Sequence, residues 1–350
     1  MRFIMQAACA IALCLYTLDG PQPQAAPVMH WIPQKSGVTA RLRGVSAASD
    51  RVVWASGANG TIVRTADGGE TWQQHPIPGT ERLDFRDIDA VDTGIAYVLS
   101  IGPGDASRIY KTADAGKHWS RQFVNDDPKA FFDAMAFWDW RHGIAISDSV
   151  DGHFVIITTR DGGATWTRVP PDGLPPALPN EGAFAASGTN ISVQPGGKAW
   201  IGTGASTTAR VLRTADWGAT WAIADTPVAA SASAGIFSVA FRDALHGITV
   251  GGDYRKESDA VDNAATTSDG GVTWTKATGL GGFRSVVAYA PHAVQPLAIA
   301  VGPSGADVSM DDGRTWTPVP GEGYHAFAFA PDGHVGWGVG ENGRIAQLTR

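Results

Sequence analysis

The fold is decided by the stretch Thr65-Ala66-Asp67-Gly68-Gly69-Glu70-Thr71-Trp72, which recurs along the 350 residues of the chain. The shared pattern is (S/T)-x-D-x-G-x-(T/H)-W, and the tryptophans of successive copies are 47, 47, 55, 53 and 42 residues apart. The six copies end at Trp72, Trp119, Trp166, Trp221, Trp274 and Trp316. A period near 50 residues predicts a set of repeated supersecondary units rather than one irregular globule.

Each residue type in the pattern suits a strand–turn–strand clip. The Thr or Ser ends a strand, the Asp accepts hydrogen bonds from backbone N–H groups of the turn, and the Gly supplies a positive φ angle. The Thr-Trp pair opens the next strand and buries an indole between units. We therefore interpret the aspartates as structural rather than catalytic; they are Asp67, Asp114, Asp161, Asp216, Asp269 and Asp311.

This pattern resembles the Asp-box, or BNR repeat, of sialidases and related β-propellers. Six copies in register make the resemblance specific for the fold. They say little about function, because many unrelated activities use the same fold.

The repeats divide the chain into units that each read as four short strands, because β-branched residues and period-two alternation run throughout. We expect an all-β fold, a seven-bladed β-propeller forming one domain over residues 27–350. The expected blades are 40–78, 83–124, 130–169, 181–226, 235–278, 282–320 and, last, 324–350 together with 29–36. The Pro-rich stretch 170–179 is expected to be a surface loop, since Pro cannot take part in a strand ladder.

The last blade is the incomplete one, because residues 324–350 supply three strands and no Asp-box. The pair His30-Trp31 resembles His118-Trp119, where a fourth strand opens. We therefore predict that an N-terminal strand completes the last blade and closes the ring, which removes both sheet edges. A six-bladed ring with a frayed tail is the alternative.

Composition excludes some classes of partner. The formal net charge is −7, and no basic tract is present, which argues against nucleic acid as a partner. No phosphate-binding loop, dinucleotide fingerprint or metal-ligand spacing is visible, so we predict no cofactor and no metal, with Ca²⁺ as the open alternative. We expect a monomer.

The N-terminus reads as a signal peptide over residues 1–26, with Arg2 ahead of a short apolar run and small residues at its exit. Export to the periplasm or the extracellular space is therefore expected, with no membrane span after processing. A retained membrane anchor is the alternative. Both cysteines, Cys9 and Cys14, lie in this segment, so the mature chain would lack disulfides.

A first candidate site comes from the starts of the innermost strands, where an apolar residue is followed by one that we expect to face the mouth of the central channel. Three arginines at one mouth predict a carboxylate or phosphate site, because guanidinium groups bind such anions bidentately. The alternative is that they pair with Asp87, Asp89, Asp133 or Asp243 and only fill the channel. The predicted ligand-binding residues are Arg43, Arg86, Asp133, Ser238, Arg284 and His325.

A second candidate site comes from irregular loops on the same face, at 147–153 and 251–259, with Glu181 at the entry to blade four. Functional residues usually collect on such loops. Carboxylates beside a Tyr suit glycoside cleavage, in which they act as acid and nucleophile, and they also suit Ca²⁺. Solvated loop polarity is the remaining interpretation. The candidates are Asp148, Asp151, Glu181, Asp253 and Tyr254.

The chain also resembles photosystem II stability and assembly factors, through the pattern F-x-D-x-x-x-G at Phe137–Gly143 and Phe241–Gly247 combined with the Asp-box. This resemblance implies a non-enzymatic, assembly-type propeller that holds a protein segment or an acidic ligand at an arginine-rich face. The irregular loops and the Pro-rich stretch depart from that family and point to a different ligand.

The second resemblance is to sialidases, which implies a glycoside hydrolase using the same face. The R-I-P phrase of that family is missing, because the candidates read Arg43-Gly44-Val45 and Arg86-Asp87-Ile88. A binding protein is therefore the first hypothesis, and a sialidase-like glycosidase is the alternative.

Overall fold

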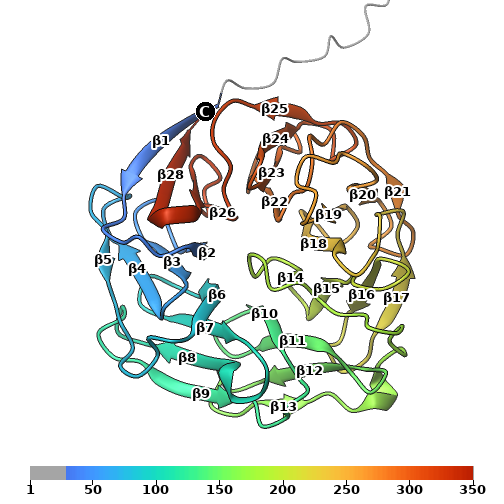
Figure 1. Ribbon diagram of the computed structural model, residues 1–350, viewed down its shortest axis with the longest axis horizontal. Coiled ribbons are helices and arrows are strands. Elements are labelled where there is room, and N and C mark those ends of the chain that lie inside the picture. Colours follow the sequence, from blue (N-terminus) through green and yellow to red (C-terminus); the bar gives the residue numbers. More distant parts are fainter. Residues whose placement is uncertain (1–28, 350) are drawn as a thin grey trace, which may run out of the picture.

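The computed structural model describes residues 29–349, which form seven four-stranded antiparallel sheets arranged as blades around a ring (Figure 1). The predicted all-β fold and the count of seven blades are confirmed. The predicted signal peptide and both cysteines lie outside the described residues. Within residues 29–349 the helices are three single 3₁₀ turns, at Gly104–Ala106, Pro171–Gly173 and Glu341–Gly343.

The first four blades follow the chain in order, each running from the centre of the ring outward. Blade one contains β2 (Leu42–Ala47), β3 (Val53–Gly57), β4 (Thr61–Thr65) and β5 (Gln73–Gln74). Blade two contains β6 (Asp84–Ala90), β7 (Ala96–Ile101), β8 (Arg108–Thr112) and β9 (Ser120–Val124). Blade three contains β10 (Phe132–Phe137), β11 (Gly143–Val150), β12 (His153–Thr159) and β13 (Thr167–Arg168). Blade four contains β14 (Ile191–Gln194), β15 (Lys198–Gly202), β16 (Arg210–Thr214) and β17 (Ala222–Asp225).

The remaining blades continue the same order until the last, which combines the two ends of the described chain. Blade five contains β18 (Ala234–Phe241), β19 (Gly247–Asp253), β20 (Ala264–Thr267) and β21 (Thr275–Lys276). Blade six contains β22 (Val286–Tyr289), β23 (Ala298–Gly302), β24 (Gly305–Ser309) and β25 (Thr317–Val319). Blade seven contains β26 (Ala326–Phe329), β27 (Gly336–Val339), β28 (Arg344–Thr349) and β1 (His30–Lys35).

The ring is closed by β1, which pairs antiparallel with β28 from His30 opposite Thr349 to Lys35 opposite Arg344. The predicted closure by the N-terminal strand is therefore confirmed. Trp31 on this strand packs on Tyr324, with ring centroids 4.4 Å apart. It belongs to the hydrophobic cluster between blades six and seven.

The six repeated turns, which we call the Asp turns, place their tryptophans at the blade interfaces. Trp119, for example, meets Trp54 of blade one edge-to-face at 5.8 Å. Trp166 and Trp274 stand edge-on to Phe137 and Phe241 of their own blades, both at 6.0 Å. Each of the six belongs to the cluster that its own blade shares with the preceding blade. The predicted position of the indoles between units is therefore confirmed; Trp221 and Trp316 are buried there, and the other four are partly buried.

The pattern F-x-D-x-x-x-G also has a physical cause. In blade three the Asp139 carboxylate accepts the backbone N–H groups of Arg141 and His142 at 2.7 and 2.8 Å, which forms the turn between β10 and β11. A Cβ at Gly143 would lie 2.6 Å from the ring of Phe137, so a side chain there would displace the aromatic ring from the blade interface.

Within each Asp turn the aspartate organises the backbone as predicted. In blade three, Asp161 accepts the N–H of Thr165 at 2.9 Å and its hydroxyl at 2.6 Å. The N–H of Gly163, whose φ is 83°, donates to Thr159 Oγ1 at 2.9 Å. These hydrogen bonds hold the turn, and the strand that follows it delivers the tryptophan.

The ring has two faces, which we name by what they carry. The turn face carries the six Asp turns. The entry face carries the starts of the innermost strands and the connections between the second and third strands, since Leu42 pairs with Gly57 at the end of β3. One expected loop on the entry face is instead a hairpin: β11 and β12 extend to Val150 and His153 and are joined by Asp151-Gly152. Both turn residues have positive φ, which suits a tight two-residue hairpin.

The Asp turns predict a pH-dependent contribution to stability. Hydrogen bonds from the Thr165 side chain and backbone lower the pKa of Asp161 to about 2. A lowered carboxyl pKa stabilises the fold above pH ~4, and this contribution is lost as the pH falls toward 2. We expect Asp161→Asn to lower the free energy of unfolding by about 1 kcal/mol at pH 7, because Asp161 is exposed, and by less at pH 3. Urea denaturation at both pH values measures this.

The matched control is Asp172→Asn, an exposed aspartate on the 3₁₀ turn after blade three. Its change should stay within about 0.5 kcal/mol at both pH values. Equal effects of the two substitutions at pH 7 would contradict the role of the Asp turn.

Candidate functional site

The channel mouth on the entry face is shaped by β-bulges near the starts of the innermost strands. In four blades the pairing with the second strand skips one residue, which is Arg43, Arg86, Asp133 or Phe237. A bulge re-aims the side chain of the extra residue. The structure thus gives a physical basis to the predicted set at Arg43, Arg86 and Asp133.

The predicted set needs correction in blades five and six. In blade five the bulged residue is Phe237, so the predicted Ser238 lies one position after the residue that corresponds to Arg43. Ser238 is fully buried. In blade six the N–H of Ser285 bonds to Val301 just as that of His325 bonds to Val339, so Ser285 is the counterpart of His325 and Arg284 is one position early. A slip of one residue turns a side chain to the opposite face of its strand. Arg284 accordingly points into its blade and pairs with buried Asp307 at 2.7 Å.

On the side of the mouth that blades one and two form, three guanidinium groups lie around Asp84. We call this cluster the Arg mouth; it consists of Arg41, Arg43 and Arg86. Arg86 pairs with Asp84 at 2.9 Å, and Arg41 lies 3.9 Å from the same oxygen. Arg43 is largely buried between them, and its Nε has no hydrogen-bond partner within the described residues. Burial, and then the charges of Arg86 and Arg41, lower the pKa of Arg43 to about 10. Arg41 and Asp84 were not predicted, and they differ from the predicted aspartate partners.

His325 supports Arg43 from blade seven. Its Nδ1 lies 3.3 Å from Arg43 Nη1, and its Nε2 lies 2.7 Å from a carboxylate oxygen of Glu341. Burial, together with the charge of Arg43, lowers the pKa of His325 to about 4, so the ring is neutral at pH 7. The geometry requires Nδ1 to accept from Arg43 and Nε2–H to donate to Glu341, which orients the guanidinium.

The central channel is blocked by residues 182–190, which we call the plug. Blade four was expected to begin at residue 181, but β14 begins only at Ile191, and the preceding residues reach into the ring (Figure 1). Arg86 donates to the Ala185 carbonyl at 2.8 Å from blade two. Thr189 bonds to Ser238 in blade five, and Ser187 bonds to Ser285 in blade six. The plug is thus anchored to three other blades.

Carboxyl groups lie directly beneath the plug. A Cβ at Gly188 would lie 2.2 Å from Asp87, and one at Gly182 would lie 1.9 Å from Asp148, so the backbone rests on both side chains. Burial raises the pKa of Asp148 to about 6. Burial, and then the charge of Asp148, raises the pKa of Asp133 well above its usual range. The structure therefore brings together Arg86, Asp133 and Asp148 of the predicted residues.

The other predicted acidic residues do not join them. Glu181 is buried and pairs with Arg210, and it also accepts the Thr203 hydroxyl at 2.6 Å. Asp151, at the tip of the β11–β12 hairpin, is exposed and pairs with Lys129 at 2.9 Å. Asp253 accepts the N–H of Arg255 in its own loop. Their catalytic roles stay predictions.

An aromatic cluster forms the other half of the entry face. Phe184 of the plug stacks on Phe237 at 3.9 Å, and Phe237 meets Phe283 edge-to-face at 4.7 Å. Tyr254 lies beside Phe184 and Phe237, at 6.4 and 6.1 Å. Sequence analysis selected Tyr254 for its hydroxyl, but the structure places it among rings.

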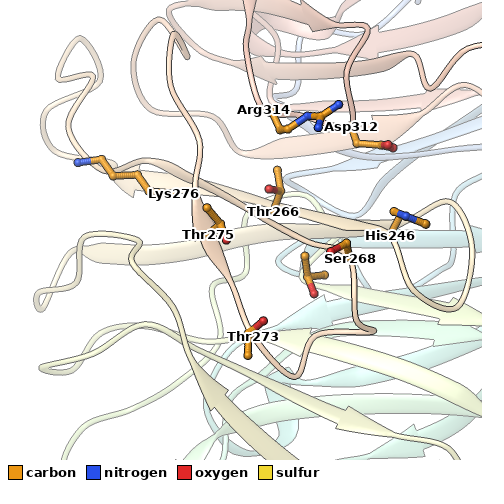
Figure 2. Close-up of a pocket in the computed structure, with 9 residues that line it drawn as sticks. His246, Thr266, Ser268, Thr273, Thr275, Lys276, Asp312 and Arg314 are labelled. Atoms are coloured by element: carbon orange, nitrogen blue, oxygen red, sulfur yellow. The ribbon is translucent and has the colours of Figure 1, made fainter.

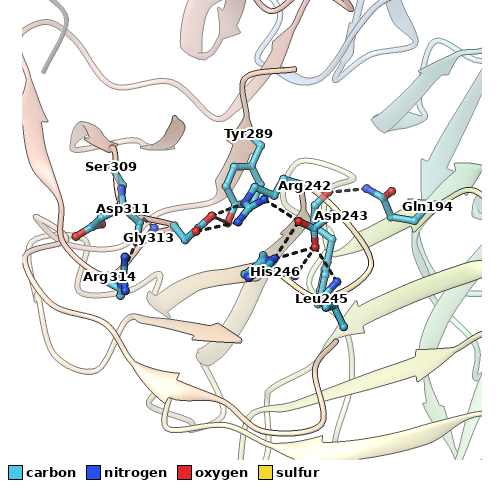
Figure 3. A network of polar contacts seen from close by, with 12 residues as sticks. Gln194, Arg242, Asp243, Leu245, His246, Tyr289, Ser309, Asp311, Gly313 and Arg314 are labelled. Carbon is cyan, nitrogen blue, oxygen red and sulfur yellow. Dashed lines mark hydrogen bonds and ion pairs between the residues drawn. The ribbon is translucent and has the colours of Figure 1, made fainter. Parts of the chain in front are cut away.

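The turn face carries a polar groove of about 420 Å³ between blades five and six (Figure 2). Hydroxyl groups from β20 and β21 form one wall and the Asp turn of blade six the other; the lining includes Thr266, Thr275, Arg314 and Asp312. Beside it, Arg242 links the blades by donating to Asp312 and to Asp243, and the Tyr289 hydroxyl also reaches Asp312 (Figure 3).

A groove at the corresponding place lies between blades four and five, lined by Trp200, Arg213 and Trp221. Because the two grooves recur with the repeat, we interpret them as products of blade packing. The plug and the Arg mouth, in contrast, do not recur with the repeat. The entry face, which carries both, is therefore the stronger candidate site.

Within residues 29–349 no three His, Cys, Asp or Glu side chains lie close enough together to hold a metal ion. The Ca²⁺ alternative stays a prediction. None of the helices there has the length and apolar character needed to cross a bilayer.

Comparison with solved structures finds the same architecture. YCF48 bound to a D1 peptide matches with a TM-score of 0.64 and 17% identity, over 93% of this chain and 98% of that chain. YCF48 from Cyanidioschyzon merolae matches with a TM-score of 0.65 and 16% identity, over 92% and 99%. The predicted resemblance is therefore confirmed at the level of the fold.

Comparison by sequence is less informative. No protein-family model matches the chain. A xyloglucanase from a Paenibacillus species is 27% identical over 210 residues, which cover 45% of this chain and 20% of the xyloglucanase. The match thus spans a fifth of that protein's length.

The carboxyl groups beneath the plug predict a second pH dependence, opposite in sign to that of the Asp turns. A carboxyl whose pKa is raised in the folded state contributes stability that is full below pH ~4 and is lost as the pH rises through about 6. We expect Asp148→Asn, which mimics the protonated carboxyl, to raise the free energy of unfolding by about 2 kcal/mol at pH 8 and to leave it unchanged at pH 4. Chemical denaturation at the two pH values measures this.

Asp151→Asn, on the same hairpin but exposed, is the control and should change stability by less than about 0.5 kcal/mol at either pH. Loss of stability in Asp148→Asn at pH 8 would show that the charged carboxylate is favourable there.

Proposed function

We propose that this protein is a non-enzymatic binding propeller that holds an acidic segment of another protein at the Arg mouth. The observation that carries the proposal is the excess of positive charge there. Arg86 and Arg41 share Asp84, whereas Arg43 contacts no carboxylate directly, and Glu341 reaches it only through neutral His325. An acidic ligand would supply the missing counter-charge, since buried cations favour a paired anion.

The geometry of Arg43 favours a carboxylate over a diffuse surface contact. Its Nε is buried without a partner, and His325 orients the opposite edge of the guanidinium. A carboxylate that binds to a guanidinium held in place in this way gains two parallel charge-assisted hydrogen bonds at little entropic cost. The plug closes the channel, so a ligand would lie across the entry face instead of passing through the ring.

A protein segment suits this surface better than a small acidic molecule does. The groups that offer contacts extend from the Arg mouth across the plug to Tyr254, which is 41% exposed. The YCF48 structure with a D1 peptide is one propeller of this architecture that holds such a segment. We further propose that the protein is exported and acts in assembly outside the cytoplasm, on the basis of its N-terminal sequence.

The carboxyl groups favour binding over glycoside cleavage. A glycosidase needs two carboxyl groups about 5–10 Å apart across an open pocket. Here Asp133 and Asp148 lie under the plug, Glu181 is paired with Arg210, and Asp151 is paired with Lys129.

The test uses a fluorescein-labelled octapeptide with Asp or Glu at four positions, titrated with residues 27–350 and followed by fluorescence polarisation. We expect Arg43→Gln and Arg86→Gln each to weaken binding by about tenfold or more, because each removes a charge-assisted contact. Affinity should also fall as salt is added.

Arg314→Gln, on the turn face, is the matched control and should bind the peptide as the unsubstituted protein does. Binding that is indifferent to both Arg-mouth substitutions would refute the proposal. Release of the chromophore from a chromogenic sialoside, abolished by Asp148→Asn, would instead favour the hydrolase.

A further inference from the structure

The side chains on the plug side of the entry face form an apolar surface that the Arg mouth does not explain. Phe237 and Phe283 are buried, whereas Tyr254 exposes 41% of its surface and Phe184 is partly exposed. The Tyr254 hydroxyl makes no hydrogen bond to any residue that the structure describes. An exposed aromatic side chain resting on a rigid aromatic base is the typical composition of a binding hot spot.

Consecutive residues of the plug connect this surface to the Arg mouth. The Ala185 carbonyl accepts a hydrogen bond from Arg86 at 2.8 Å, and the neighbouring Phe184 stacks on Phe237 at 3.9 Å. The plug therefore already presents, from within the chain, a backbone acceptor to a guanidinium and a ring to the aromatic cluster. These contacts of the plug indicate the groups that a ligand of the entry face would present: a hydrogen-bond acceptor for a guanidinium and an aromatic ring for the cluster.

On this basis we propose that Tyr254 and Phe184 form an aromatic subsite for the ligand of the Arg mouth. The preferred ligand is an extended peptide that carries a carboxylate and, within about four residues of it, an aromatic side chain. This inference rests on the proposed function, because the carboxylate is placed at the Arg mouth.

The spacing follows from the printed contacts. The Arg86 guanidinium lies 2.8 Å from the Ala185 carbonyl, Ala185 directly follows Phe184, and the Phe184 ring lies 6.4 Å from that of Tyr254. The path along these contacts is at most roughly 13 Å, and an extended chain advances about 3.3 Å per residue, so the two ligand groups lie within about four residues of each other.

The charge beside Tyr254 also favours a peptide with acidic residues as the ligand. The guanidinium of Arg255 lies over the Tyr254 ring at 5.7 Å, so a positive group borders the aromatic subsite as well. A peptide with acidic residues around its aromatic residue therefore matches both halves of the entry face, whereas a purely apolar peptide matches only the aromatic half.

The test compares three labelled octapeptides that differ only at the chosen positions. One carries Glu and, four residues later, Trp; the second has Ala in place of Trp; the third has Gln in place of Glu. We expect the Glu–Trp peptide to bind about tenfold more tightly than the Glu–Ala peptide. In Tyr254→Ala this preference should disappear, so that the Glu–Trp and Glu–Ala peptides bind with similar affinity.

Tyr254→Phe keeps the ring and should keep the preference, and Val261→Ala, an exposed apolar residue of the same loop, should leave it intact. Thermal unfolding confirms that each variant is folded. A Glu–Trp preference that is absent in the unsubstituted protein, or that survives in Tyr254→Ala, would overturn the aromatic subsite.

The two proposals fail in different ways. Arg43→Gln should weaken both Glu peptides and leave the Gln–Trp peptide unaffected. If Arg43→Gln changes the affinity of none of the peptides while the Trp preference still depends on Tyr254, the proposed binding at the Arg mouth is refuted and the aromatic subsite is supported. If binding depends on Arg43 but not on Trp, only the subsite is overturned.

Discussion

The contact on which the ring depends is an indole packed between two blades. The Asp turns supply six of these indoles, and Trp31 supplies the seventh, between blades six and seven. Each indole contributes a large apolar area at the interface, so a four-stranded sheet that cannot bury its faces alone is stabilised by its neighbour. The entry face depends on this arrangement, because the radial position of each blade sets where Arg43, Arg86 and Phe237 lie on it.

The fold could be predicted because its determinants are local and repeated. In each Asp turn a side chain bonds to backbone groups within four residues, so the signal survives in the sequence without tertiary information. Closure by His30–Lys35 was also predictable, because one incomplete blade and one unmatched His-Trp pair leave a single economical solution.

The site could be predicted only in part, because it depends on register and on an irregular segment. A bulge adds one residue without a sequence signal, so Ser238 was assigned one position after the bulged Phe237. Arg284 was assigned one position before Ser285, the residue that corresponds to His325. The plug was counted within blade four, whose expected bounds of 181–226 follow from the repeat. Its insertion depends on contacts with three distant blades, and no local pattern encodes those contacts.

The pairing of β1 with β28 has a consequence for the order in which the molecule is made. The two strands lie more than 300 positions apart, at residues 30–35 and 344–349, so the closing ladder cannot form until nearly the whole described chain is available. Blades one to six can assemble from neighbouring segments as they emerge, but β1 must wait beside blade one with its ladder groups unpaired. During synthesis closure therefore comes last, and until then the unpaired ladder groups of β1 form an open sheet edge that favours aggregation.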